Sequence, residues 1–308
     1  MPYARGLLAG LAIALLAGAL VVLGFELLDE GGGAERTAGV AATATPSPSP
    51  TATAPATPAP TPTPFVVDAS SALAEARPQV EAALDGFPGD WGFHVIDLPS
   101  GSEMGLNNEQ NFYPASAGKI VVAIAVLRQV DQGIRDFDPI RDRFEQMILI
   151  SSDEAADELD ALVNESETQQ VLIDAGASAN ASFPGWRQGF VSARDLALVW
   201  RALVQGELLS SDMAGYLLDL TARVELAPEF ETFPARFRAG YLYGQKAGYN
   251  IQSFPHTFVG AGYALSADLR YGFVAVLILR TDATAEETRA QRTLVHPILV
   301  DHLLPPAE

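Results

Sequence analysis

The chain contains no cysteine and almost no lysine. The absence of cysteine from its 308 residues excludes disulfides, thiolate metal sites and a cysteine nucleophile. Among 19 basic residues, only Lys119 and Lys246 are lysines, and the others are arginines. Arginine supplies positive charge but keeps its proton, whereas a lysine amine can act as a base. We therefore expect the two lysines to stand where the chemistry of an amine is required.

Basic charge and metal ligands are also scarce. The formal net charge of -19 argues against nucleic-acid binding, which needs a basic face. The four histidines form no metal-binding pair, and His94, inside a predicted strand, is interpreted as structural. We predict neither a metal nor another cofactor. Five acidic residues follow one another with helical spacing, which predicts a solvated helix face rather than a cation site. They are Asp153, Glu154, Asp157, Glu158 and Asp160.

The N-terminal segment has the pattern of a membrane anchor. Residues 7–25 carry no charge, with Arg5 before the run and Glu26 and Asp29 after it. Such a run is long enough to cross a bilayer, and the positive-inside rule leaves the rest of the chain outside the cytoplasm. A cleaved signal peptide is the alternative, but the run exceeds a usual signal core and no small-x-small site closely follows. We predict a single-pass anchor over residues 1–29.

Residues 30–65 cannot build a core. A Gly-Gly-Gly run at 31–33 leads into 43–64, a stretch made only of Thr, Pro, Ala and Ser. This composition favours extended polyproline II structure without a packed interior. We predict a stalk that lifts the following domain away from the membrane.

The remainder, 66–308, predicts an α+β domain with an antiparallel sheet. Helical spacing covers 69–84, and alternation then predicts strands at 91–98 and 102–106. Further helices are expected at 141–150, 154–163, 167–175, 193–204 and 211–222, strands at 241–249, 257–265 and 271–279, and a last helix at 285–303. Strands at both ends predict one sheet built from 66–120 and 235–308, flanked by helices, with an all-α part, 121–234, inserted. A site is expected between the two parts.

A serine and a lysine open the apolar run at 120–127. Ser116 and Lys119 are three residues apart at a predicted helix start, so both lie on one face. A desolvated lysine can activate a serine, and a helix N-terminus offers N–H groups to an oxyanion. The spacing alone is common in ordinary first turns. The scarcity of lysine favours a nucleophile.

Five stretches in this order resemble class A β-lactamases and serine penicillin-binding enzymes. They are WGFHVIDLPSG, NFYPASAGK, MILISSDEAADEL, SARDLALVWRALVQGELLS and GQKAG. The resemblance runs from residue 69 to the last predicted helix and covers the three motifs of that family, Ser-x-x-Lys, Ser-Asp-Asn and Lys-Thr-Gly. It implies the β-lactamase/transpeptidase fold and β-lactams or peptidoglycan-peptide-like amides as substrates.

The resemblance also implies roles for single residues. Ser116 would attack the carbonyl, Lys119 would take or relay its proton, and Ser151 would pass a proton to the leaving nitrogen with help from the charge of Lys246. The N–H groups of Ser116 and Tyr249 would form an oxyanion hole. Two of these residues also have a structural alternative to a catalytic role: Ser151 as a helix cap and Lys246 as a charge on a strand edge.

Three departures from the family's pattern bear on activity. Asp153 stands where an amide would donate to substrate, and near Lys119 its charge would keep the amine protonated. Ala247, before Gly248, removes a hydroxyl that would bind a substrate carboxylate. No glutamate, the deacylating base of the family's lactamases, occurs between 167 and 207.

The carboxylates nearest to the loop in which the family has its glutamate are Asp174, in the predicted helix before that loop, and Asp195, in the predicted helix after it. We therefore expect an extracytoplasmic serine hydrolase that forms an acyl-enzyme and deacylates slowly. The alternative is a non-catalytic module of the same fold that binds cell-wall peptide or a partner protein. The oligomeric state is left open.

Overall fold

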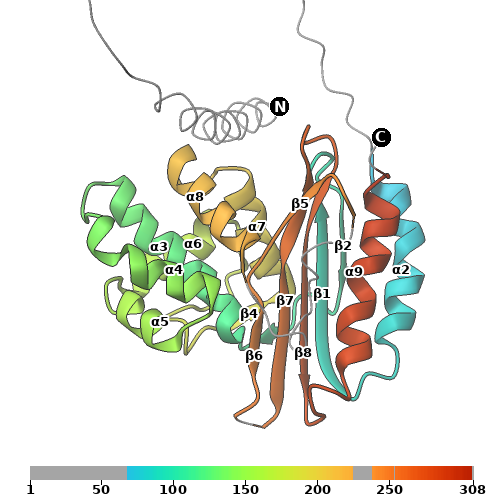
Figure 1. Cartoon of the computed structure of the whole chain (residues 1–308). Coiled ribbons are helices and arrows are strands. Elements are labelled where there is room, and N and C mark those ends of the chain that lie inside the picture. Colours follow the sequence, from blue (N-terminus) through green and yellow to red (C-terminus); the bar gives the residue numbers. More distant parts are fainter. Residues whose placement is uncertain (1–67, 225–237, 253, 307–308) are drawn as a thin grey trace, which may run out of the picture. The chain divides into compact units, whose positions relative to one another are not determined.

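A computed structural model describes residues 68–224, 238–252 and 254–306 (Figure 1). The predicted anchor, 1–29, and all of the predicted stalk, 30–65, lie outside these ranges and stay predictions. Among the helices that are described, none is long and apolar enough to cross a bilayer.

A six-stranded sheet runs through the middle of the domain. The strand order is β2-β1-β8-β7-β5, with β6 also paired to β7, and every pair is antiparallel. The strands are β1 (Gly89–Asp97), β2 (Glu103–Leu106), β5 (Tyr241–Gln245), β6 (Gly248–Asn250), β7 (His256–Ser266) and β8 (Gly272–Thr281). The first two precede the helical segment and the others follow it. The predicted α+β class with an antiparallel sheet is confirmed.

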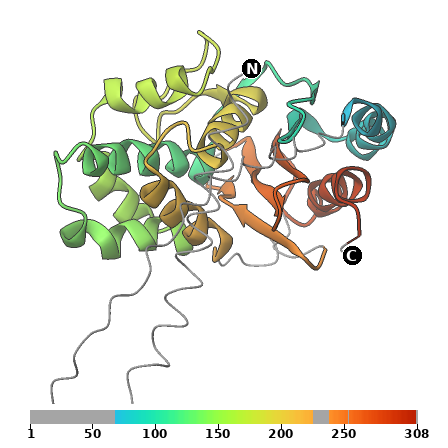
Figure 2. The same cartoon turned by 90° about the horizontal axis from the view of Figure 1, so that it is seen from above.

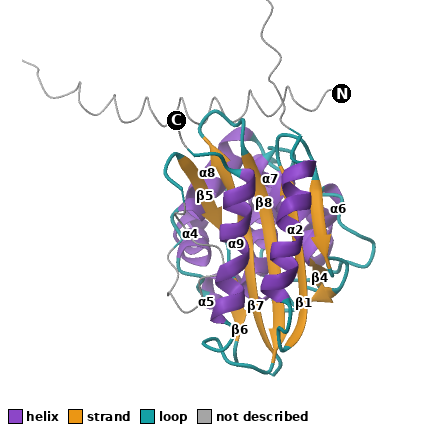
Figure 3. Cartoon of the chain, turned by 90° about the vertical axis from the view of Figure 1, so that its right-hand side faces the viewer, coloured by secondary structure: helices purple, strands orange, loops and turns teal. Residues whose placement is uncertain are grey.

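Helices cover both faces of the sheet. On one face lie α2 (Ser70–Leu84) and α9 (Arg289–Leu303), which pack against each other (Figure 3). Successive side chains of a strand point to opposite faces, and β8 follows this rule. The residues that join the core under α2 and α9 are Phe273, Ala275, Leu277 and Leu279. The intervening Val274, Val276 and Ile278 join the core on the other face.

The other face carries the remaining helices (Figure 2). They are α3 (Lys119–Asp131), α4 (Arg141–Leu149), α5 (Asp153–Asp160), α6 (Glu165–Asp174), α7 (Ala193–Val204) and α8 (Ser211–Ala222). Helix α7 packs on β1, β7 and β8, and a capping box of Ser192 and Asp195 fixes its start. Asn164 and Glu167 do the same for α6.

Three sequence-based boundaries are wrong, each for a local reason. Ser116 lies in a 3-10 turn, η1 (Ala115–Gly118), and α3 begins only at Lys119. The strand expected at 241–249 is interrupted at 246–247, although β5 and β6 pair with β7 in one register. The last helix begins at Arg289 rather than at 285, because Thr284 and Glu287 bond to each other and close a separate turn.

A second, two-stranded sheet was not predicted. Strands β3 (Asn111–Phe112) and β4 (Val191–Ser192) pair antiparallel. Two-residue strands are too short to produce a periodic pattern, so the sequence gives no signal for them. Their pairing ties the segment that leads into Ser116 to the segment that leads into α7.

Candidate active site

Ser116 lies on a strained turn. The preceding residue, Ala115, has φ of 48°, in the left-handed region that costs a residue with a Cβ about 1–2 kcal/mol. In a 3-10 turn the side chains at i and i+3 eclipse, so Ser116 and Lys119 share a face. Ser116 is half-buried, whereas the residues that follow it in the turn are buried. The fold thus presents one hydroxyl at the surface of a packed and strained segment, as is common at functional sites.

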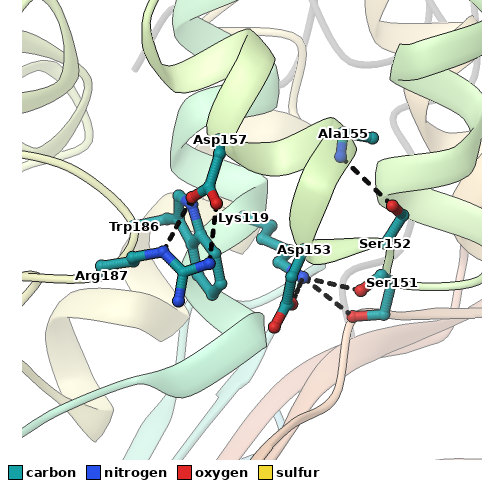
Figure 4. A network of polar contacts seen from close by, with 8 residues as sticks. All are labelled: Lys119, Ser151, Ser152, Asp153, Ala155, Asp157, Trp186 and Arg187. Atoms are coloured by element: carbon teal, nitrogen blue, oxygen red, sulfur yellow. Dashed lines mark hydrogen bonds and ion pairs between the residues drawn. The ribbon is translucent and has the colours of Figure 1, made fainter.

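Lys119 is fully buried and donates to three oxygens (Figure 4). Its Nζ lies 2.6 Å from Asp153 Oδ1, 2.7 Å from the Ser151 carbonyl oxygen and 3.4 Å from Ser151 Oγ. The ring of Trp186 lies 4.4 Å from the same nitrogen. Burial lowers the pKa of Lys119, and the hydrogen bond and charge of Asp153 oppose that shift. The predicted proximity of Lys119 and Asp153 is present in the structure.

Ser151 is a second strained residue beside the amine. Its φ is 58°, again in the left-handed region. Helix α5 is capped by the next residue, Ser152, whose Oγ accepts from the N–H of Ala155 at 3.2 Å. The alternative that made Ser151 the helix cap is therefore wrong. Its hydroxyl instead faces Lys119.

Lys246 stands in the gap between β5 and β6 and is fully buried. Within the described ranges its Nζ has no hydrogen-bond partner. Tyr243 joins the core under α2 and α9, so by strand alternation Lys246, three residues later, points to the opposite face, towards Lys119. Burial and then the charge of Lys119 lower the pKa of Lys246 to about 7. An exposed charge on a strand edge, the other alternative, is excluded by this burial.

Strand β6 presses against the turn that carries Ser116. A Cβ at Gly248 would lie 2.5 Å from Ala117 N, 2.6 Å from Pro114 O and 3.0 Å from Ser116 N. Only a glycine permits this approach. It brings the N–H of Ser116 next to the strand that continues into Tyr249, the second predicted oxyanion donor.

Ala247, the residue before Gly248, is buried and 2% exposed. Its methyl group can neither donate nor accept a hydrogen bond. This agrees with the sequence analysis, in which Ala247 lacks the hydroxyl that would bind a substrate carboxylate.

The loop between α6 and β4 carries an aromatic and a cation instead of a glutamate. Trp186 Nε1 donates to Asp157 Oδ1 at 3.0 Å, and Arg187 holds both oxygens of Asp157 at 2.8 Å. The guanidinium of Arg187 lies 4.2 Å from the Trp186 ring (Figure 4). This bidentate pair lowers the pKa of Asp157, with the Arg187 hydrogen bonds as the main cause.

Sequence reasoning missed the contacts of Asp157, Trp186 and Arg187 with one another. One signal was available: Asp157 follows Asp153 by four residues, so both carboxylates lie on the same face of α5. Trp186 and Arg187 lie in a loop without hydrophobic periodicity, so the sequence gives no signal for their contacts with Asp157.

The acidic face of α5 is exposed as predicted, but several of its carboxylates have partners. Glu158 pairs with Arg143 at 3.0 Å, and Asp160 accepts from the backbone of Trp186. In the part of the chain that the structure describes, no three potential ligands come together as a metal site.

The two carboxylates that flank the loop are engaged elsewhere. Asp174 pairs with Arg128 at 2.7 Å, and Asp195 accepts from Ser178 N at 2.7 Å as well as capping α7. Neither is available to activate a water at Ser116.

The site thus contains the half-buried hydroxyl of Ser116, the buried amines of Lys119 and Lys246, and the hydroxyl of Ser151 beside Lys119. This set can perform nucleophilic attack with proton transfer, and the loop between α6 and β4 adds no carboxylate to it, because residues 175–190 contain neither Asp nor Glu.

Residues 75–139 and 138–252 match the family model Beta-lactamase2, described as the beta-lactamase enzyme family. No curated protein matches the sequence. Among solved structures, TLA-1 extended spectrum beta-lactamase has a TM-score of 0.67 at 12% identity and covers 76% of this chain and 100% of its own.

Two further structures are similar. A beta-lactamase from Chitinophaga pinensis DSM 2588 has a TM-score of 0.66 at 18% identity, over 74% of this chain and 98% of its own. The structure titled PBP-A has a TM-score of 0.60 at 19% identity, over 74% of this chain and 96% of its own. At these identities the three structures establish the shared fold alone.

Proposed function

Because the chain belongs to the beta-lactamase enzyme family, we propose that Ser116 forms an acyl-enzyme with β-lactams or with D-Ala-D-Ala-like amides. The observation that carries this proposal is the position of Ser116. It is a half-buried hydroxyl on a strained turn, pressed against β6 at Gly248 and sharing a face with a buried amine. Serine needs an adjacent base to become a nucleophile, and lysine is the residue type that this chain otherwise avoids.

The reaction needs three contributions from the site. Ser116 Oγ bonds to the carbonyl carbon, and its single proton is taken up by Lys119, the buried amine on the same face. The N–H groups of Ser116 and Tyr249 stabilise the oxyanion, a kind of contact worth about 3–4 kcal/mol in acyl transfer. Ser151 carries a proton to the leaving nitrogen, for which its hydroxyl beside Lys119 is suited.

Deacylation is proposed to be slow. The loop that would supply a carboxylate supplies Trp186 and Arg187, and the indole covers the Lys119 amine. A water at the acyl carbon would therefore meet no carboxylate base from this loop, whose residues 175–190 contain neither Asp nor Glu. The acyl-enzyme is expected to persist, and efficient lactamase turnover is not expected.

The proposed location rests on the sequence. An uncharged run at 7–25 and a Thr/Pro/Ala stretch at 43–64 would anchor the domain in the cell membrane and hold it on the extracytoplasmic side. Cell-wall peptides are found on that side, which agrees with the proposed substrates.

A fluorescent penicillin tests the acylation. We expect the full chain to become covalently labelled and Ser116→Ala to abolish labelling. Ser152→Ala is the matched control, because it removes only a helix cap, worth about 1 kcal/mol, and should still label. Mass spectrometry of the adduct over time then measures deacylation, and an adduct lost within seconds would contradict slow release.

One observation favours a second function. Burial lowers the pKa of Lys119, but the ion pair with Asp153, 2.6 Å long, favours the charged amine and so opposes its use as a base. If the wild-type chain is not labelled at high reagent concentration, the acylation proposal fails. A non-catalytic module that binds cell-wall peptide or a partner protein is then the better description.

A further inference from the structure

The Asp153 carboxylate uses only one of its two oxygens inside the protein. Its Oδ1 accepts from the Lys119 amine at 2.6 Å, and within the residues that the structure describes no hydrogen bond reaches Oδ2. Figure 4 shows this second oxygen turned away from Lys119 and Ser151. Lys119 is fully buried, whereas the Asp153 side chain is 58% exposed. One carboxylate oxygen is therefore open to a ligand.

This open oxygen lies beside the segment that carries the nucleophile. Lys119, the partner of Asp153, shares a face with Ser116 in the 3-10 turn. The charge of Asp153 also acts on Tyr113, three residues before Ser116. Burial raises the pKa of the Tyr113 hydroxyl, the charge of Arg187 opposes this shift, and the charge of Asp153 adds to it. A substrate bound at Ser116 would thus have the Asp153 carboxylate next to it.

The cations around Asp153 leave its exposed charge uncompensated. Arg187 holds both oxygens of Asp157 at 2.8 Å, so these two charges cancel each other. Strand β6, Gly248–Asn250, contains no charged residue, and Lys246 before it is fully buried. Lys119 is buried behind Oδ1. Among the described residues of this site, the exposed and unpaired charge is therefore negative.

The rest of the chain acts in the same direction. It has 38 acidic and 19 basic residues, for a formal net charge of -19. Such a field attracts cationic ligands and repels anionic ones. Ala247, on the strand side of the site, offers no hydrogen bond to a substrate carboxylate. Local and long-range charges thus both favour a cationic substrate.

We propose that Asp153 selects substrates whose acyl part, the part that stays on Ser116, carries a primary ammonium, with Oδ2 as its acceptor. This inference rests on the proposed acylation of Ser116 and narrows the class of its substrates. An ammonium has three hydrogen-bond donors and no acceptor, so it matches the open carboxylate oxygen. A carbonyl or carboxylate in the same place would bring a second acceptor against the first.

Two penicillins that differ in one group test this selection. Ampicillin carries an amino group on its acyl side chain where benzylpenicillin has a hydrogen, and at pH 6 this amine is protonated, since an α-amino group has a pKa of about 8. Competition of each compound with fluorescent penicillin for the full chain gives its acylation rate. We expect ampicillin to acylate the wild type about 5-fold faster, the factor that an ion pair open to water contributes. In Asp153→Asn the two rates should become about equal.

Glu154→Gln is the matched control. It removes one negative charge from the same turn of α5, and no described contact joins the exposed Glu154 side chain to the site. It therefore weakens the field of the whole chain as much as Asp153→Asn does, and it should keep the preference for ampicillin. Because the two rates are compared within each variant, a change in Lys119 reactivity cancels. Equal rates in the wild type, an undiminished preference in Asp153→Asn, or its loss in Glu154→Gln would overturn the proposal.

A second measurement does not depend on acylation. Ser116→Ala removes the nucleophile, so calorimetry can measure the dissociation constants of both penicillins at equilibrium. Ampicillin should bind about 5-fold more tightly than benzylpenicillin, and adding Asp153→Asn should remove the difference. If neither penicillin acylates the wild type, the proposed function fails, while these constants still test the role of Asp153. Equal constants in Ser116→Ala, or no binding of ampicillin, would show that Asp153 does not select an ammonium.

Discussion

Asp153 is the carboxylate that pairs with the buried Lys119 amine. Its Oδ1 holds the Lys119 amine at 2.6 Å, while its side chain is 58% exposed and thus open to a ligand. A carboxylate at this position only accepts hydrogen bonds, so it favours a donor on the substrate over a carbonyl. The Asp153 carboxylate therefore favours the charged form of Lys119, and it also favours ligands that present a hydrogen-bond donor beside it.

Asp153→Asn should weaken the hold on the Lys119 proton. Burial lowers the pKa of Lys119, and losing the opposing charge of Asp153 lowers it further. In NMR of the full chain labelled with carbon-13 at lysine Cε, the Lys119 signal should therefore titrate at lower pH than in the wild type. Asp157→Asn is the control, because it loses the contacts to Trp186 and Arg187 but leaves the hydrogen bonds of Lys119 intact. An unchanged Lys119 titration in Asp153→Asn would mean that burial, rather than the ion pair, sets its charge.

At the scale of elements, the site depends on how closely β6 approaches η1. The backbone atoms that a Gly248 Cβ would meet lie at 2.5–3.0 Å, and backbone cannot move aside as a flexible side chain can. The strand and the turn therefore have to separate if this glycine gains a methyl group. Such a separation would displace the N–H of Ser116 from the strand that leads into Tyr249.

Gly248→Ala should accordingly lower the labelling rate by about 100-fold or more, in line with the loss of one oxyanion donor. Gly272→Ala is the matched control in the same sheet, since its Cβ would meet Ala264 O at 2.8 Å, far along the sheet from η1. Both variants should be less stable, but only the first should label slowly when rates are corrected for the folded fraction. Equal labelling by the two variants would contradict the role of this contact.

At the scale of the whole molecule, the sheet and its helices follow from periodicity, whereas the loop contacts do not. Alternation in 271–279 predicts β8, and its residues divide between two cores as alternation requires. Ser116 and Lys119 were predicted from spacing and from the scarcity of lysine. Trp186 contacts Lys119 from a loop without periodicity. The two lysines, both fully buried, differ in their hydrogen-bond partners, which only folding creates.

The buried amine of Lys246 should make the protein less stable than it could be. Its folded pKa, about 7, lies below the ordinary value of a lysine, so between these two values the unfolded chain binds more protons than the folded one. Stability should therefore rise with pH from about 7 upward, and the full cost of the buried charge should be present below 7. Lys246→Met, which removes that charge at similar size, should be more stable at pH 6 by an amount on the order of 2–4 kcal/mol.

Urea denaturation of the full chain measures this difference, followed by the fluorescence of Trp91, Trp186 and Trp200, which all lie in the described domain. The advantage of Lys246→Met should shrink as the pH rises above about 7, because the folded amine is then neutral and the cost of deprotonating the unfolded amine falls as the pH approaches its ordinary pKa. If Lys246→Met is no more stable than the wild type at pH 6, burial does not destabilise the Lys246 ammonium, and this prediction is wrong.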